Sequence, residues 1–213
     1  HFIPEYLKAD TSRKADSILP KTTASVRLQN DYIVGNQGDN VDYKYGLVHR
    51  RYHSLLKQYQ ERYGFYDISL IDVAGNIVYT TLKEIDYATN LNTGPHRLSG
   101  LASIFQKAMK LDRLGKTALQ DFAPYSPSFG KPAAFIATQI HSHGKLIGIA
   151  VFQLSIDQIN DIMTSKQNWF SEGYGNTGES YILASDYSMR NDSRFLITEP
   201  EMFFDQLANT DID

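Results

Sequence analysis

Residues 66–81 read YDISLIDVAGNIVYTT, and this stretch decides the fold. β-Branched, aromatic and other apolar residues stand on both sides of the tripeptide Ala74-Gly75-Asn76. Apolar runs that flank a Gly-Asn turn are typical of a β-hairpin. The sequence therefore predicts two antiparallel strands joined by a tight turn.

A weaker version of this pattern occurs at residues 179–192, ESYILASDYSMRND. Tyr181, Ile182 and Leu183 precede a polar turn, and Met189 starts the return. Two similar openings far apart in one chain indicate one small fold used twice. A duplicated, hairpin-led fold without a catalytic signature favours sensing over chemistry.

The composition describes an ordinary globular protein and excludes several classes of function. The chain has 213 residues, of which 42% are hydrophobic and 21% are charged, with a net charge of −3. That charge gives no basic footprint for nucleic acid. The absence of cysteine excludes disulfides, thiolate metal sites and a cysteine nucleophile. The apolar run at residues 146–154 is far shorter than the ~20 residues of a membrane span.

Residues 1–63 are predicted to be mainly helical. Candidate helices cover residues 10–19, 22–34 and 41–63, and the polar stretch 35–40 is a loop. The third helix carries an apolar stripe at helical spacing: Tyr45, Val48, Tyr52, Leu55, Leu56 and Tyr59. No sustained heptad repeat is present.

From residue 64 onward the pattern becomes α+β. The hairpin is followed by a polar segment, a helix and three strand candidates, at residues 83–95, 98–111, 118–124, 133–140 and 145–154. Five antiparallel strands with helices on one face form a PAS-like arrangement. The predicted fold class is thus α+β, with a helical region at 1–63 and a PAS-like lobe at 64–164.

Residues 165–213 are expected to begin a second lobe. A glycine-rich hinge at 173–178 leads into the second hairpin, and Pro200 starts a helix. Two strands and a helix do not make an independently stable unit. The expectation is that the sequence stops inside this second small domain.

Several stretches carry a resemblance to a known family. The chain resembles the extracytoplasmic double-Cache (tandem PAS-like) sensor domains of bacterial transmembrane receptors over residues 45–205. The resemblance is carried by YGFYDI (63–68), NIVY (76–79), KEIDYATNL (83–91), DFAPYSPS (121–128), PAAFI (132–136), GESYI (178–182) and MRNDSRF (189–195).

The resemblance implies a long N-terminal helix, a membrane-distal lobe that holds a small-molecule pocket, and a membrane-proximal lobe. Such domains belong to chemotaxis receptors, sensor histidine kinases and nucleotide or diguanylate cyclases. They lie on the periplasmic or extracellular side of the inner membrane, and segments absent from this chain tether them to it. The resemblance also implies a homodimer, with residues 1–63 supplying much of the interface.

Family members that bind amino acids use an Arg and a Trp to hold the ligand carboxylate, and an Asp late in the fifth strand to hold the amine. That Asp corresponds by position to Gln153 here. Arg97 suits the Arg role, but Leu98 and Ser99 follow where the aromatic is expected. Because Gln153 is neutral, a ligand ammonium loses its charge partner, so an α-amino acid is less expected.

The candidate ligand-binding residues are Asp121, Tyr125, Phe135 and Gln153, with Arg97 and Tyr79 as second choices. Each also has a structural interpretation. Phe135 suits the core, and Asp121 and Gln153 suit hydrogen bonds to a cover loop.

The sequence predicts no metal, no cofactor and no enzymatic activity. His141 and His143 lie at a strand end without further ligands nearby, which is typical of a solvated hairpin tip. His49 and His53 lie one helical turn apart, and a polar helix face against a partner helix is the favoured interpretation. The Gly173–Gly178 stretch lacks the Lys-Ser/Thr pair of a phosphate-binding loop.

The function expected from these observations is ligand sensing for transmembrane signalling. Two other functions stay open. The distal lobe could bind a periplasmic protein with its own pocket filled by side chains, or the module could be a structural spacer that dimerises.

Overall fold

The computed structural model describes residues 22–34, 43–185 and 187–210. Its helical elements are α2 (Thr23–Gln29), the π-helical turn η2 (Asn30–Val34), α3 (Lys44–Tyr63), α4 (Gly100–Met109), the 3-10 turn η4 (Ser126–Ser128), α5 (Ile156–Met163), α6 (Arg194–Thr198) and α7 (Pro200–Ala208). Its strands are β1 (Phe65–Asp72), β2 (Ile77–Thr80), β3 (Thr117–Pro124), β4 (Pro132–Ser142) and β5 (Lys145–Leu154). The chain divides into two compact units, residues 1–154 and 155–213.

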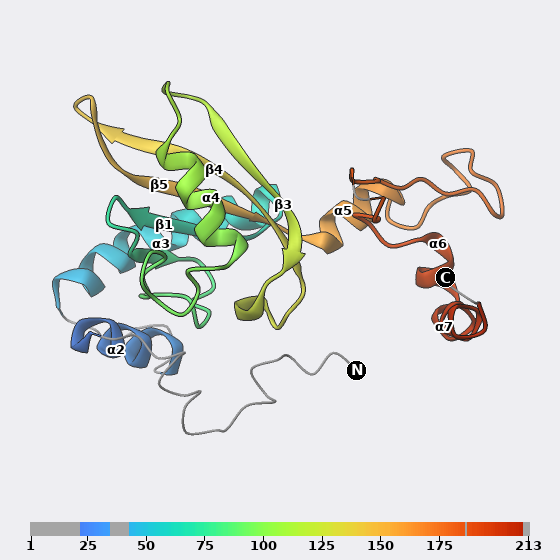
Figure 1. Cartoon of the computed structure of the whole chain (residues 1–213), viewed down its shortest axis with the longest axis horizontal. Helices are drawn as coiled ribbons and strands as arrows, with labels where there is room; N and C mark the ends of the chain where they lie inside the picture. Colours follow the sequence, from blue (N-terminus) through green and yellow to red (C-terminus); the bar gives the residue numbers. More distant parts are fainter. Residues whose placement is uncertain (1–21, 35–42, 186, 211–213) are drawn as a thin grey trace. The chain divides into compact units, whose positions relative to one another are not determined.

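The first unit is built on one antiparallel sheet of five strands in the order β2-β1-β5-β4-β3 (Figure 1). The first and last strands in sequence thus pair at the centre, and the α+β, PAS-like sheet predicted from the sequence is confirmed. The predicted strands over 118–124, 133–140 and 145–154 match β3, β4 and β5 closely. Exposed and half-buried residues alternate along β3, whereas β4 and β5 contain continuous apolar runs.

The β1–β2 hairpin forms as its sequence predicts. Gly75 has φ +88°, a left-handed conformation that favours glycine. The Asp72 carboxylate closes the turn, since Oδ1 accepts hydrogen bonds from the backbone N–H groups of Ala74 and Asn76, both at 2.9 Å. Backbone geometry and side-chain capping therefore favour the same hairpin.

Helix α4 covers one face of this sheet, here called the inner face. Its Ser99 cap accepts a hydrogen bond from the Ala102 N–H, and its apolar side packs on β3, β4 and β5. The core between them is apolar and fully buried, and includes Ile71, Leu101, Ile104, Phe105, Phe135, Ile149 and Val151. Removing such area from water is the main force that holds helix and sheet together.

Helix α3 lies against the opposite, outer face of the sheet (Figure 1). Leu70 and Tyr79 point toward α3, whereas Ile71 points into the inner core, as expected for alternating side chains of a strand. Gly64 ends α3 at φ +70° and turns the chain directly into β1.

The other predicted helices are found where the structure describes the chain. The helix expected at 22–34 becomes α2 followed by the π-helical turn η2, that at 41–63 is α3, and that at 98–111 is α4. The helix expected at 10–19 and the loop at 35–40 lie outside the described residues. The boundaries predicted at 63/64 and 164/165 stay a prediction.

The second unit corrects one prediction. The hairpin expected near residues 181–189 does not form strands, because only one isolated bridge joins Leu183 to Met189. Tyr181, Ile182 and Leu183 are exposed, so no further strand or helix covers them among the described residues. An uncovered two-stranded ribbon is marginal in water, which explains the loss of regular strands. The helix predicted to start at Pro200 is confirmed as α7.

No helix within the described ranges combines the length and apolar character needed to span a bilayer.

Candidate ligand site

One row of side chains crosses the inner face near the end of the sheet. Asp67 on β1 pairs with Gln153 on β5, and Gln153 pairs with Phe135 on β4. All three are buried, although two are polar. The register of the three central strands thus places a polar patch beside the apolar core.

The segment 81–99 between β2 and α4, here called the cover segment, is tied to this row by Asp67. The Asp67 Oδ1 atom accepts hydrogen bonds from the backbone N–H groups of Thr81 at 2.8 Å and Leu82 at 3.0 Å, and from the Thr81 hydroxyl. These bonds satisfy a carboxylate that would otherwise be costly to bury. Asp67 therefore fixes where the cover segment leaves the sheet.

Asp86 of the cover segment meets Tyr125, which follows β3. The Tyr125 hydroxyl donates to Asp86 Oδ2 at 2.5 Å, and the Tyr125 ring packs edge-on against Phe135 with ring centroids 5.2 Å apart. Asp86 is 3% exposed, and its Oδ1 atom has no hydrogen-bond partner. A buried carboxylate oxygen without a partner is uncommon in folded proteins.

A second chain of hydrogen bonds runs beside this pair. Gln153 Nε2 donates to the Ser128 hydroxyl at 3.0 Å, and that hydroxyl donates to Glu84 Oε2 at 2.9 Å. The Tyr66 hydroxyl donates to the other oxygen, Glu84 Oε1, at 2.8 Å. We refer to Tyr66, Glu84, Asp86, Tyr125, Ser128 and Gln153 together as the polar cluster.

Burial dominates the electrostatics of the polar cluster. Burial, together with the negative charges of Asp67 and Glu84, raises the pKa of Asp86 to about 7, against a lowering by the Tyr125 hydrogen bond. Burial also raises the pKa of Glu84 and of Asp67, although hydrogen bonds favour their charged forms. Three carboxyl groups thus share a region of low dielectric constant, which disfavours full ionisation.

The structure brings three of the six sequence candidates together in the polar cluster or its apolar wall: Tyr125, Phe135 and Gln153. Arg97 and Asp121 are exposed. The Arg97 guanidinium donates to the Gly94 carbonyl at 3.4 Å, and Asp121 accepts from the N–H of Phe122. Side chains of β3 alternate in direction and this strand lies at the sheet edge, which explains why Asp121 does not face the cluster.

Tyr79 belongs to an aromatic cluster on the outer face, between the sheet and α3. Its hydroxyl lies 2.8 Å from His53 Nδ1, and the buried Lys83 ammonium lies 4.0 Å from its ring centroid. Lys83 also faces Tyr87 and Tyr32 at 5.1 and 5.9 Å. Cations over aromatic rings gain electrostatic stabilisation, which offsets part of the cost of burying Lys83.

The histidine pair of α3 contributes to the same aromatic cluster. The His49 and His53 rings stack with centroids 4.5 Å apart, and His49 also contacts Tyr32 and Tyr79. Burial, with repulsion from Lys83, lowers the pKa of His49 to about 3 and also lowers that of His53. The expectation that these histidines face a partner helix is therefore wrong, because they face the sheet of their own chain.

Sequence reasoning missed four members of the polar cluster: Tyr66, Glu84, Asp86 and Ser128. The last three lie outside the strands, in polar stretches where carboxylates and hydroxyls are normally solvated. The one available signal was composition, since the KEIDYATNL stretch at 83–91 mixes charges with apolar residues that suit burial. Only the path of the cover segment beneath the sheet places its carboxylates beside Gln153.

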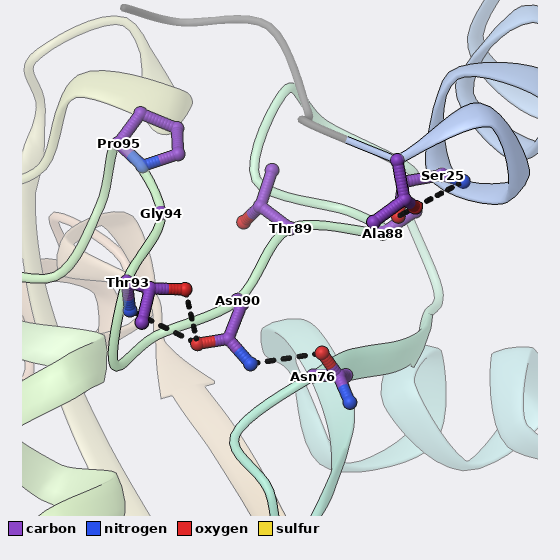
Figure 2. Close-up of a pocket in the computed structure, with 9 residues that line it drawn as sticks. Ser25, Asn76, Ala88, Thr89, Asn90, Thr93, Gly94 and Pro95 are labelled. Atoms are coloured by element: carbon purple, nitrogen blue, oxygen red, sulfur yellow. Dashed lines mark hydrogen bonds between the residues drawn. The ribbon is translucent and has the colours of Figure 1, made fainter.

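Two cavities lie elsewhere in the first unit. The smaller, of about 160 Å³, lies beside the loop that carries Asn90 (Figure 2). The Asn90 side-chain Nδ2 donates to Asn76 Oδ1, and its Oδ1 accepts from the Thr93 N–H. The larger, of about 350 Å³, is an apolar groove between α3 and the outer face, lined by Tyr45, Val48, His49, Tyr52, Leu55, Leu56, Leu70, Val78 and Tyr79. No residue of the polar cluster lines either of these two cavities.

Metal-ligating side chains do not converge in the part of the chain that the structure describes, where no group of three or more His, Cys, Asp or Glu residues is placed to hold an ion. His143 lies in the β4–β5 turn at φ +50°, with its Nδ1 atom 3.1 Å from the Ser142 hydroxyl.

The solved structures similar to this chain are ligand-binding sensory domains of bacterial chemoreceptors. One is the ligand-binding domain of Campylobacter jejuni chemoreceptor Tlp3 in complex with 4-methylisoleucine, at 9% identity and a TM-score of 0.49, covering 92% of this chain and 67% of that one. Another is that of Pseudomonas fluorescens CtaA in complex with L-serine, at 13% identity and a TM-score of 0.46, covering 89% and 71%. No protein-family model and no curated protein matches the chain. Likeness at this level does not assign a ligand to the chain.

Proposed function

We propose that this chain is an extracytoplasmic ligand-sensing domain of a bacterial membrane signalling receptor, with its ligand site at the polar cluster. The observation that carries the proposal is the buried position of Asp86, Tyr125 and Gln153 between a PAS-like sheet and a loop segment. Polar groups grouped inside an otherwise apolar core cost stability, and a binding site accounts for that cost. The function proposed is recognition without chemistry.

The cover segment supports a route for the signal. On the inner face it carries Glu84 and Asp86, and on the outer face it carries Lys83 and Tyr87. The Tyr87 hydroxyl donates at 2.8 Å to the Tyr45 hydroxyl of α3. A ligand that moves this segment would change the packing of α3.

The mechanism we propose is a population shift. A ligand that binds the open and closed arrangements of the cover segment with different affinity moves the equilibrium between them. The resulting displacement of α3 passes to a membrane helix and a cytoplasmic output domain outside this chain.

The proposal includes tethering to the bacterial inner membrane and a homodimer formed through α3. Val48, Tyr52, Leu55 and Tyr59 are exposed on one side of this helix at intervals of four, three and four residues. This spacing fits the packing of two helices against each other. The second copy would cover the apolar groove beside α3.

A thermal-shift screen tests ligand sensing, with amino acids, organic acids, amines, nucleobases and sugars as the panel. A compound that binds the folded state raises the melting temperature, and the rise grows with the logarithm of its concentration once the site is saturated. Gln153→Ala and Tyr125→Ala are expected to abolish the rise while circular dichroism shows a folded domain. Full affinity in both variants would show that the site is misplaced.

The apolar groove also favours a second function, in which the domain binds a periplasmic protein. Its lining residues Val48, Tyr52, Leu55 and Val78 are exposed, and exposed apolar patches commonly mark protein interfaces. Flat thermal shifts over the whole panel, with a folded protein, would favour this function over ligand sensing.

A further inference from the structure

We infer that the polar cluster selects a cationic ligand, a primary or secondary ammonium held by Asp86 and Glu84, and that the carboxylate absent at position 153 is thereby supplied from the cover segment. This inference rests on the proposed ligand-sensing function and adds the chemical class of the ligand. It depends on the contacts of Asp86, on the neutral character of its neighbours and on the geometry around them.

Asp86 has an acceptor that the protein leaves unused. Its Oδ2 atom takes the Tyr125 hydroxyl, whereas its Oδ1 atom, in the interior, has no hydrogen-bond partner. A hydrogen-bond donor that reached Oδ1 would satisfy it, and a charged donor would gain roughly twice the energy of a neutral one. The unsatisfied Asp86 Oδ1 acceptor therefore favours a ligand N–H group that carries positive charge.

The groups that contact the two carboxylates are neutral. Glu84 takes hydroxyl groups from Tyr66 and Ser128, and Asp86 takes one from Tyr125. Within the described ranges neither carboxylate has a Lys, Arg or His partner at ion-pair distance. The neighbouring Lys83 directs its ammonium to the Thr80 carbonyl and the Tyr79 ring instead. The two carboxyl groups thus lack a cationic side-chain partner in the described part of the chain.

The chemistry of the cluster favours an ammonium over a metal ion. Asp67, the third carboxyl group, is engaged with the backbone and the Thr81 hydroxyl, and the side chains described include no trio placed for a metal. The Tyr66 and Tyr125 hydroxyls each donate to one of the two carboxyl groups, which leaves the Asp86 Oδ1 acceptor for a further donor. One ammonium N–H group matches this single acceptor.

The ligand is expected to lack an α-carboxylate. Arg97, the residue suited to hold one, is exposed and bonded to the Gly94 carbonyl. A ligand carboxylate beside Glu84 and Asp86 would add a further negative charge to a buried region that already holds three carboxyl groups. The inferred class is therefore alkylamines and diamines, not α-amino acids.

The test uses four probes with a four-carbon chain, butylamine, putrescine, butanol and butyrate, together with norvaline, which is butylamine with a carboxylate on its amine-bearing carbon. Melting temperature and calorimetric affinity are measured for the whole chain at neutral pH. We expect the two amines to raise the melting temperature, and butanol, butyrate and norvaline to leave it unchanged.

The variants Asp86→Asn and Glu84→Gln keep the shape of the cluster and remove its charge. Each is expected to weaken amine binding about tenfold or more, as loss of a charge-assisted bond implies. Asp112→Asn is the matched control, because it removes an exposed carboxylate that pairs with Lys116 outside the cluster. This control is expected to bind amines like the parent chain.

A second readout needs no variant. Asp86 faces Glu84 on its own segment, Asp67 on β1 and Tyr125 after β3, and protonation of this group removes the charge that the ammonium needs. Amine affinity is therefore expected to fall as pH is lowered from about 8 to about 6, because the alkylammonium itself stays charged over this range.

Three outcomes overturn the inference. A neutral or anionic probe that binds through Gln153 would leave ligand sensing intact and exclude a cationic ligand. Amine binding that is unchanged in Asp86→Asn, or independent of pH, would place the amine elsewhere. No response to either amine, together with a flat response to the wider panel, would reject both the inference and the proposed function.

Discussion

Asp86 is the residue on which the proposed ligand site depends. It is buried, and it keeps a proton more tightly than an exposed aspartate because burial and the charges of Asp67 and Glu84 oppose its ionisation. The sequence could not predict this, since Asp86 lies in a polar loop with no periodic pattern. Tyr125 and Gln153 were predicted as ligand-binding residues with the help of a family resemblance, and that role stays a prediction. The structure places the two residues in hydrogen bonds to Asp86 and Ser128.

The first prediction concerns pH and stability. The pKa of Asp86 is about 7 in the folded chain against an ordinary value of 3.8, so the folded state binds this proton more tightly. The bound proton on Asp86 stabilises the folded state fully at pH values below the pKa that Asp86 has in the unfolded chain. This stabilisation, on the order of a few kcal/mol, is lost as pH rises through the folded-state pKa of about 7. Glu84 and Asp67, whose pKa values are also raised, act in the same direction.

Denaturant unfolding of the parent chain and Asp86→Asn at several pH values measures this effect. The variant is expected to be the more stable protein near neutral pH, and its stability is expected to depend less on pH. Parallel pH profiles for the two proteins would show that Asp86 ionises freely in the folded state.

At the scale of elements, the sequence predicted both the position and the packing of α4, but only the position of α3. Helix α4 was predicted because its apolar residues have helical periodicity, and all of them except the partly buried Met109 are buried. The stripe on α3 was also predicted, but its role was not, since Val48, Tyr52 and Leu55 are exposed while His49 is buried against the sheet. The cover segment has no regular structure, so its path depends on particular hydrogen bonds that no pattern reveals.

The second prediction tests how the cover segment is anchored. Thr81→Val keeps the shape of the side chain but removes the hydroxyl that donates to Asp67 Oδ1. Loss of this hydrogen bond to the buried Asp67 carboxylate is expected to lower the free energy of unfolding by about 1–3 kcal/mol. The matched control is Thr117→Val on β3, where the side chain is exposed. Equal stability losses in both variants would mean that the anchor contributes nothing specific.

The third prediction concerns the exposed side of α3. Leu55 is 62% exposed and lies on the apolar stripe, so Leu55→Asp is expected to convert a dimer to a monomer in light scattering. Ser54→Asp adds the same charge to the same helix outside the stripe and is expected to leave the dimer intact. A parent chain that is monomeric at high concentration would remove the basis for a dimer through α3.

At the scale of the whole molecule, the sequence predicted the α+β class and the five-stranded sheet because strand periodicity and turn residues agree along residues 65–154. The second unit was predicted less well. Its expected strands need neighbours in a sheet, and the described residues offer only the Leu183–Met189 bridge. Local sequence patterns identify strands well only where the rest of the sheet is present to pair with them.

The fourth prediction is that the first unit folds without the second. Residues 22–154 contain the complete sheet and α4 together with its core. This fragment is expected to unfold cooperatively, with a melting temperature within a few degrees of the full chain, as a domain with its own core should. An insoluble fragment, or one without a cooperative transition in calorimetry, would show that the sheet needs residues 155–213.

The most direct test of the ligand site is a backbone amide NMR titration of the chain with butylamine. We expect chemical-shift changes to concentrate in the cover segment, at residues 125–128 and around Gln153. The variant Asp86→Asn is expected to remove them. Changes confined to α3 and the outer face of β1 and β2, or no changes at all, would contradict a ligand site at the polar cluster.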